Sequence, residues 1–162
     1  MSTHIALLGE KGAGKSTLIS RFAKGNVGGF RTYLLSEERG IRTFAMAPYG
    51  SEERGEIIGE SDGKHRKGFP EVFDTYGVSL LDPAGKDLLV MDEIGVMEEG
   101  TEAFRRAVLS CLDGDVPVLL ALKDRPDSPL IRSVLEHENV AVYEVTEDNR
   151  EALYEILSGS RE

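Results

Sequence analysis

A glycine-rich octapeptide near the start of the chain constrains the fold more than any other feature. Residues 9–16 read GEKGAGKS and fit the pattern G-x-x-x-x-G-K-[ST] at every defined position. Gly9 and Gly14 let the backbone curl so that successive N–H groups point inward and surround an anion. An apolar run at 4–8 precedes the loop, and apolar residues at helical spacing follow it to about Ala23. We therefore expect a strand, a phosphate-binding loop and a helix, in that order.

The side chains of this loop have separate expected roles. Lys15 can reach the outer phosphates as a point charge, and the Ser16 hydroxyl is a ligand suited to Mg²⁺. The helix that begins here adds its positive N-terminal end to the site. Thr17 is expected beside the α-phosphate, whereas Glu10 and Lys11 occupy free positions of the motif and are expected at the rim. The predicted nucleotide-binding residues are Gly9, Glu10, Lys11, Gly12, Ala13, Gly14, Lys15, Ser16 and Thr17.

The rest of the chain predicts an α/β fold with one insertion. After Pro83, strand-like runs alternate with helical segments, which is typical of parallel strands joined by right-handed crossovers. Residues 30–81 differ, because short strand-like segments there are separated by charged, glycine-ended turns, and they predict an antiparallel ribbon. We expect a three-layer sandwich: a mostly parallel sheet with helices on both faces, plus the inserted ribbon. Residues 1–162 are expected to form a single domain.

Charge and cysteine content limit the partners. The 29 acidic residues outnumber the 19 basic ones and give a formal charge of −10. Such a surface repels nucleic-acid backbones and anionic membranes, so we expect neither as a partner, and no protein partner is identified. Cys111 is the single cysteine and no basic leader precedes the first apolar run, so we expect a reducing, cytoplasmic location.

Two adjacent acids, Asp92 and Glu93, end the strand-like run at 88–91. In a parallel sheet, the carboxyl end of this strand would lie close to the phosphate-binding loop. Asp92 is therefore the expected carboxylate on the Mg²⁺ side, together with Ser16. Glu93 suits a general base that orients the water attacking the γ-phosphate. Simpler roles also remain open: Asp92 could cap a turn, and Glu93 could hydrogen-bond to neighbouring backbone.

A family resemblance follows from three segments that occur in this order: GEKGAGKST at 9–17, VGGFRT at 27–32 and DEIGVME at 92–98. In this combination the chain resembles the P-loop nucleoside-triphosphatases first described from thermophiles, whose human member is called cancer-related nucleoside-triphosphatase. The resemblance spans nearly the whole chain. It implies a RecA-like fold with an added antiparallel ribbon, and slow Mg²⁺-dependent hydrolysis of ATP, GTP and other nucleoside triphosphates with broad base tolerance.

One residue departs from the family pattern. Members usually carry a lysine directly after DEIG, where this chain has Val96. Such a lysine can stabilise the charge that develops on the γ-phosphate, so the rate depends on whether another cation replaces it. The candidates within the chain are Lys123, Arg125 and Arg31, and an arginine of a partner protein is another. Arg125 is the first choice. The expected catalytic residues are thus Lys15, Glu93 and Arg125.

Two other functions compete with hydrolysis. Phosphoryl transfer to a small acceptor, as in nucleoside or nucleotide kinases, would use Arg125 and Arg132 in a short lid over the acceptor. A nucleotide-binding switch would bind the same ligands but retain only weak hydrolysis, because Val96 replaces the usual lysine. Hydrolysis is the leading hypothesis, since a carboxylate in the position of Glu93 is needed to activate water.

Overall fold

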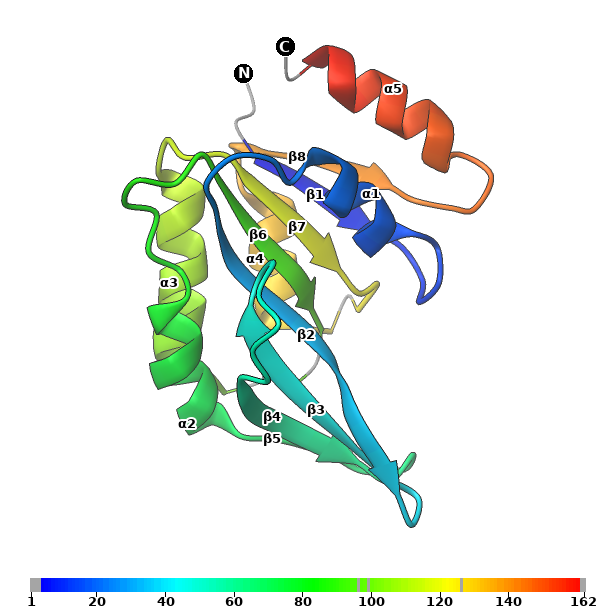
Figure 1. Cartoon of the computed structure of the whole chain (residues 1–162), viewed down its shortest axis with the longest axis vertical. Helices are drawn as coiled ribbons and strands as arrows, with labels where there is room; N and C mark the ends of the chain where they lie inside the picture. Colours follow the sequence, from blue (N-terminus) through cyan, green and yellow to red (C-terminus); the bar gives the residue numbers. More distant parts are fainter. Residues whose placement is uncertain (1–3, 96, 99, 126, 161–162) are drawn as a thin grey trace.

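Eight strands form one sheet in the order β5-β4-β3-β2-β6-β7-β1-β8. The structure, a computed structural model, describes residues 4–95, 97–98, 100–125 and 127–160 (Figure 1). Val96, where the chain departs from the family pattern, lies outside the described residues. The strands are β1 (His4–Leu8), β2 (Val27–Glu38), β3 (Ile41–Pro48), β4 (Glu56–Ser61), β5 (Arg66–Gly68), β6 (Leu88–Ile94), β7 (Val118–Leu122) and β8 (Val140–Glu144).

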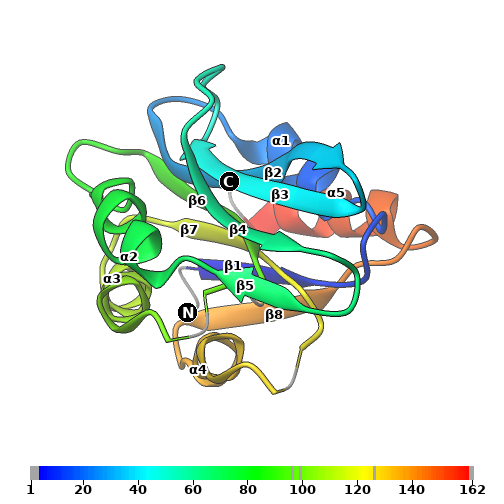
Figure 2. The ribbon, with the colours of Figure 1, turned by 90° about the horizontal axis from the view of Figure 1, so that it is seen from below.

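Helices cover both faces of the parallel half of the sheet, as the sequence predicts. Figure 2 shows α3 and α4 on one face and α1 and α5 on the other. The helices are α1 (Lys15–Phe22), α2 (Pro70–Val72), a π-helical turn (Phe73–Gly77), α3 (Glu102–Asp113), α4 (Pro129–Glu136) and α5 (Arg150–Ser160). The prediction of a three-layer α/β sandwich is confirmed. No helix in the described part of the chain is long and apolar enough to cross a membrane.

The run that forms β6 is buried on both sides because its residues alternate between two cores. Leu89 and Met91 pack with α3 and α4, whereas Leu88 and Val90 pack with α1 and α5. A central parallel strand covered by helices on both faces is expected to read as a continuous apolar run. The strand therefore reaches Asp92 and Glu93 from within the core.

The ribbon is part of the same sheet, because β2 pairs with strands of both the parallel half and the ribbon. Its first residues, 27–31, pair in parallel with β6, and its continuation pairs antiparallel with β3. β4 and β5 complete the ribbon as further antiparallel strands. The ribbon strands thus span 27–68, and not the whole of 30–81 as the sequence predicts. Residues 70–77 are helical instead, since Pro70 begins a helix and Phe73 is buried against Phe104.

A glycine lets β2 approach β6 closely at the point where the two halves join. Gly29 has a φ of 101°, and a Cβ built on it would lie 1.9 Å from the carbonyl oxygen of Val90. No side chain fits there without moving a central strand. This contact sets the register in which Arg31 lies opposite Asp92, and so brings the ribbon to the end of β6.

We predict that Gly29→Ala lowers the free energy of unfolding by about 3 kcal/mol or more, because strain at positive φ adds to a backbone clash. Gly40→Ala is the matched control, since Gly40 also has a positive φ, of 78°, but its Cβ would meet nothing within 4 Å. The free energy of unfolding of this control is expected to fall by about 1 kcal/mol. Urea unfolding of the two variants and the parent measures both values, and equal losses would contradict the account.

Candidate functional site

The loop predicted to bind phosphate connects β1 to α1 and has the backbone that such a site needs. Gly12 and Gly14 have φ values of 85° and 105°, in the left-handed region that favours glycine. Gly14 also caps the start of α1. Glu10 and Lys11 are exposed at the rim, as expected, and Thr17 is exposed on the first turn of the helix. The loop is therefore shaped to present N–H groups and a helix N-terminus to an anion.

Lys15 contacts residues at the ends of three strands at this edge of the sheet. Its side chain is only 5% exposed. Its Nζ donates hydrogen bonds to the carbonyl oxygens of Gly9 (2.5 Å) and Leu122 (3.0 Å), at the ends of β1 and β7. It also forms an ion pair of 2.7 Å with Oε2 of Glu93, on β6. The predicted phosphate-binding lysine and the predicted general base are thus direct partners.

Ser16 and Asp92 lie beside this ion pair. The Ser16 hydroxyl donates a hydrogen bond of 3.0 Å to Oδ1 of Asp92. Burial raises the pKa of Asp92, while the bond from Ser16 and the charge of Lys15 oppose the rise. A hydroxyl and a carboxylate are the hard oxygen ligands that Mg²⁺ prefers, and Mg²⁺ sites commonly use only one or two carboxylates with substrate phosphates. The donor set fits the metal that the sequence predicts.

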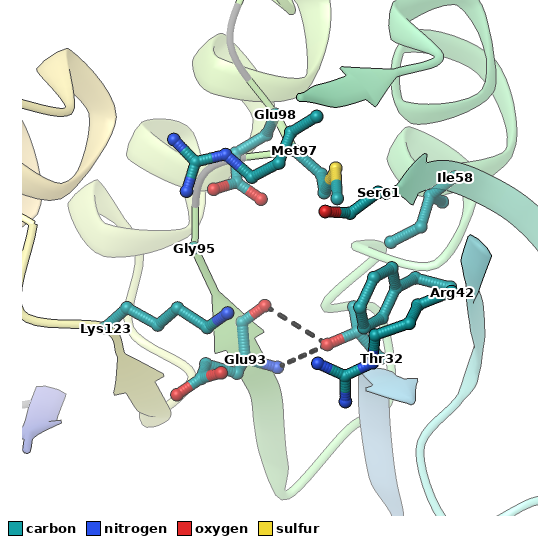
Figure 3. A pocket seen from close by; sticks show the side chains of 11 residues that line it. Thr32, Arg42, Ile58, Ser61, Glu93, Gly95, Met97, Glu98 and Lys123 are labelled. Atoms are coloured by element: carbon teal, nitrogen blue, oxygen red, sulfur yellow. Dashed lines mark hydrogen bonds between the residues drawn. The ribbon is translucent and has the colours of Figure 1, made fainter. Parts of the chain in front are cut away.

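The backbone of Glu93 is hydrogen-bonded to the ribbon. Its N–H donates to the hydroxyl of Thr32, on β2, at 3.2 Å (Figure 3). Its carboxylate forms the ion pair with Lys15, and the described residues show no hydrogen bond from neighbouring backbone to it, the simpler role that the sequence left open. The side chain is 24% exposed, so it faces both the loop and solvent. A carboxylate in this position can exchange its cation for a water molecule.

The three cations considered as replacements for the usual lysine lie in different surroundings. Arg125 pairs with Asp127 in the loop after β7, at 3.3 and 3.4 Å. Arg31 donates to backbone carbonyl oxygens of the turn at 51–53 and lies over the ring of Tyr33. Of the three, only Lys123 lines the cavity that Glu93 also lines. Arg125 remains a prediction, and Lys123 has the closer geometric relation to Glu93.

Sequence reasoning missed Glu98, although it lies in the DEIGVME segment. Its side chain is 7% exposed, and burial raises its pKa to about 8. Hydrogen bonds from the backbone of Gly95 and Glu98 itself, and the charge of Lys123, oppose this rise. Its Oε1 has no hydrogen-bond partner within the described ranges. Burial therefore favours the neutral form of Glu98, which lines the same cavity as the predicted base.

Other residues near the site also escaped the sequence analysis. Arg150, at the start of α5, packs against Gly14, where an added Cβ would lie 2.5 Å from its side chain. Arg42 and Arg66, from the ribbon strands β3 and β5, line the same cavity as Glu93. No local motif marks these arginines, because Arg42 and Arg66 reach the cavity through the pairing of the ribbon strands, and Arg150 reaches the loop through the packing of α5.

Comparisons with known proteins identify the family and the fold. Residues 4–158 match the model of a protein family described as NTPase. The nucleoside-triphosphatase THEP1 of Thermotoga maritima is 31% identical over 166 residues, which cover 95% of this chain and 93% of that protein. The fold is similar to the crystal structure of THEP1 from Aquifex aeolicus (TM-score 0.72, 23% identity, 95% and 96% of the two chains). It is also similar to the solution structure of a human cancer-related nucleoside triphosphatase (TM-score 0.67, 21% identity, 99% and 98%).

We predict that Glu98→Gln changes how stability depends on pH. Because the pKa of Glu98 rises from 4.5 to about 8 on folding, the unfolded chain releases this proton first. The parent should therefore lose stability from this group between about pH 4.5 and pH 8. From pH 5 to pH 8.5, the variant should gain about 2–5 kcal/mol relative to the parent.

Urea unfolding at several pH values measures this difference. Glu155→Gln, at an exposed position on α5, is the control and should follow the parent at every pH. A constant difference between Glu98→Gln and the parent across this range would show that Glu98 ionises normally in the folded protein.

Proposed function

The chain belongs to the NTPase family of P-loop nucleoside-triphosphatases, and from this premise we propose that it hydrolyses ATP, GTP and other nucleoside triphosphates with Mg²⁺. The products are a nucleoside diphosphate and inorganic phosphate. The observation that carries the proposal is a pair of interactions at one edge of the sheet. Lys15 forms an ion pair with Glu93, and Ser16 donates a hydrogen bond to Asp92. The single cysteine, buried on α3, fits the cytoplasmic location that we also propose.

Binding of the triphosphate begins with an exchange of partners at Lys15. The loop N–H groups and the start of α1 receive the phosphates, and Lys15 Nζ turns from the Glu93 carboxylate to the outer phosphate oxygens. This exchange keeps a buried ammonium paired throughout, which matters because an unpaired buried charge is costly. It also releases the Glu93 carboxylate at the moment when the γ-phosphate arrives.

Glu93 then acts as the general base. Its free carboxylate orients a water molecule and accepts its proton as the water oxygen bonds to the γ-phosphorus. The bond from that phosphorus to the β–γ bridging oxygen breaks, and its electron pair stays on the diphosphate. The bond between Thr32 and the Glu93 N–H holds the base in place during this step.

The Mg²⁺ site would use Ser16 and Asp92 with phosphate oxygens. When bound, the ion supplies positive charge that offsets the charge on the β- and γ-phosphates. The Ser16–Asp92 hydrogen bond holds the two oxygen donors together, and Asp92 is only 9% exposed. Deprotonated Asp92 is the form that binds a cation, and the nearby charge of Lys15 favours it.

Water fits the space beside Glu93 better than a nucleoside acceptor does. The cavity that Glu93 lines has a volume of about 190 Å³. Pockets for drug-sized ligands are typically about 300–1,000 Å³, so a nucleoside would not be enclosed here. This size supports hydrolysis over the kinase alternative. The switch alternative differs in predicting that turnover does not depend on Glu93.

We predict that Glu93→Gln lowers kcat by about 10²–10⁴-fold, because the amide cannot accept the proton of water. Nucleotide binding should be retained, since the loop and Lys15 are intact. Phosphate release measures the first effect and fluorescent-nucleotide titration the second. Glu102→Gln, exposed on α3, is the control and should behave as the parent. Turnover unchanged in Glu93→Gln would remove the base assignment and favour the switch.

A second pair of variants identifies the cation that stabilises the charge developing on the γ-phosphate. We propose Lys123 for this role on the basis of the cavity that it shares with Glu93. Lys123→Ala should lower kcat by about 10²-fold, similar to the loss of one donor to a developing oxyanion. Arg125→Ala, which breaks an exposed pair with Asp127, should change kcat by less than about threefold. The reverse order of effects would restore Arg125 as the predicted catalytic residue.

A further inference from the structure

The cavity beside Glu93 lies between the ribbon and the ends of the parallel strands. Its walls come from all four ribbon strands and from the segments that follow β6 and β7. Figure 3 shows Lys123 and Glu98 on one side of it and Arg42, Ser61 and Ile58 on the other. Glu93, the partner of Lys15, is one of the residues that line it.

Three cations converge on this cavity in a protein whose formal charge is −10. Arg42 lies with Nε 3.1 Å from a carboxylate oxygen of Glu37, yet this buried Nε makes no hydrogen bond in the described part of the chain. Arg66 reaches from β5 toward the loop after β7. There it contributes to the lowered pKa of Asp127, of which the hydrogen bond from Arg125 is the main cause. Lys123 is the third cation. The cavity therefore gathers three cations beside the carboxyl groups of Glu93 and Glu98, which also line it.

Glu98 adds a buried carboxyl group of which one oxygen has no hydrogen-bond partner among the described residues. It lines the cavity, and Figure 3 shows its carboxyl group facing the space above Gly95 and Lys123. Its Oε1 makes no hydrogen bond within the described residues. A buried polar atom without a partner calls for an explanation, and a ligand oxygen in the cavity would supply one. A neutral carboxylic acid can donate a hydrogen bond to such an oxygen.

We propose that this cavity is a binding site for inorganic phosphate, which it receives from the γ position after hydrolysis and holds before release. The proposal rests on the proposed function, because that function supplies the phosphate beside Glu93. Arg42 and Arg66 bind the oxyanion as charge-assisted donors from the ribbon side, and Lys123 binds it from the side of β7. The hydroxyls of Thr32 and Ser61 line the same space as further donors.

The arrangement of charges favours the release of inorganic phosphate in one direction. After the reaction, phosphate lies between the negatively charged diphosphate and Glu93, which holds the proton taken from water. Arg42 and Arg66 line the cavity from the ribbon strands β3 and β5, so they attract the anion away from the diphosphate. The volume of about 190 Å³ accommodates a small tetrahedral anion. In this proposal, the ribbon contributes an exit path for phosphate.

Equilibrium binding of inorganic phosphate tests the proposal. The full-length protein is first saturated with Mg²⁺ and a nucleoside diphosphate, which fill the loop, and phosphate is then titrated in by calorimetry. Arg66→Gln should weaken phosphate binding by about tenfold, as expected for losing a charged donor. Arg66 lies on the exposed edge strand β5, so its replacement leaves the core intact. Arg42→Gln should have a similar effect, and Arg106→Gln, exposed on α3, should have none.

Two results would overturn the inference. One is absence of phosphate binding to the diphosphate complex, or binding that neither ribbon arginine affects. The other is tighter binding of glycerol phosphate than of inorganic phosphate, which would assign the cavity to a phosphorylated small molecule from solution. The titration involves no turnover, so a failure of the proposed hydrolysis would leave a positive result standing. Conversely, a protein that hydrolyses nucleotides but fails the titration would lose only this inference.

Discussion

The ion pair between Lys15 and Glu93 is the interaction on which the rest of the site depends. Lys15 is nearly buried, and its ammonium is bonded to two backbone carbonyl oxygens and one carboxylate. Removing one partner of a buried pair typically costs about 3–5 kcal/mol, so the ammonium can leave Glu93 only for another anion. A triphosphate is such an anion. In the proposed mechanism, substrate binding and release of the base are therefore the same event, and Glu93 becomes free only when there is a γ-phosphate to attack.

The ribbon extends this arrangement from the loop to the cavity beside Glu93. Because β2 pairs with β6 before it turns away, Thr32 reaches the backbone of Glu93 and fixes the base. The later ribbon strands then bring Arg42 and Arg66 to the other wall of the cavity. Gly29 allows the close contact between β2 and β6 that sets this register. The inserted strands thus complete a site that the parallel half alone would leave open to solvent.

The sequence predicted those parts of the site that depend on local patterns. The loop from Gly9 to Thr17 is contiguous, and the strand that carries Asp92 and Glu93 is identified by its apolar run. Arg42 and Arg66 could not be found in this way, because their positions depend on strand pairing across the ribbon. The helical turn at 70–77 was predicted as ribbon, although Pro70 and apolar residues at helical spacing were visible signals. The raised pKa of Glu98 depends on burial, which a charged residue in a loop does not reveal.

A structure of the protein with Mg²⁺ and a non-hydrolysable nucleoside triphosphate tests the central claim most directly. If substrate binding releases the base, Lys15 Nζ will be bonded to the outer phosphate oxygens and no longer to Glu93. The Glu93 carboxylate should then hold a water molecule in line with the γ-phosphorus, within about 3.2 Å of the carboxylate. A bound triphosphate with the Lys15–Glu93 ion pair intact would contradict the account, because the base would still be bonded to the cation that substrate binding is proposed to remove.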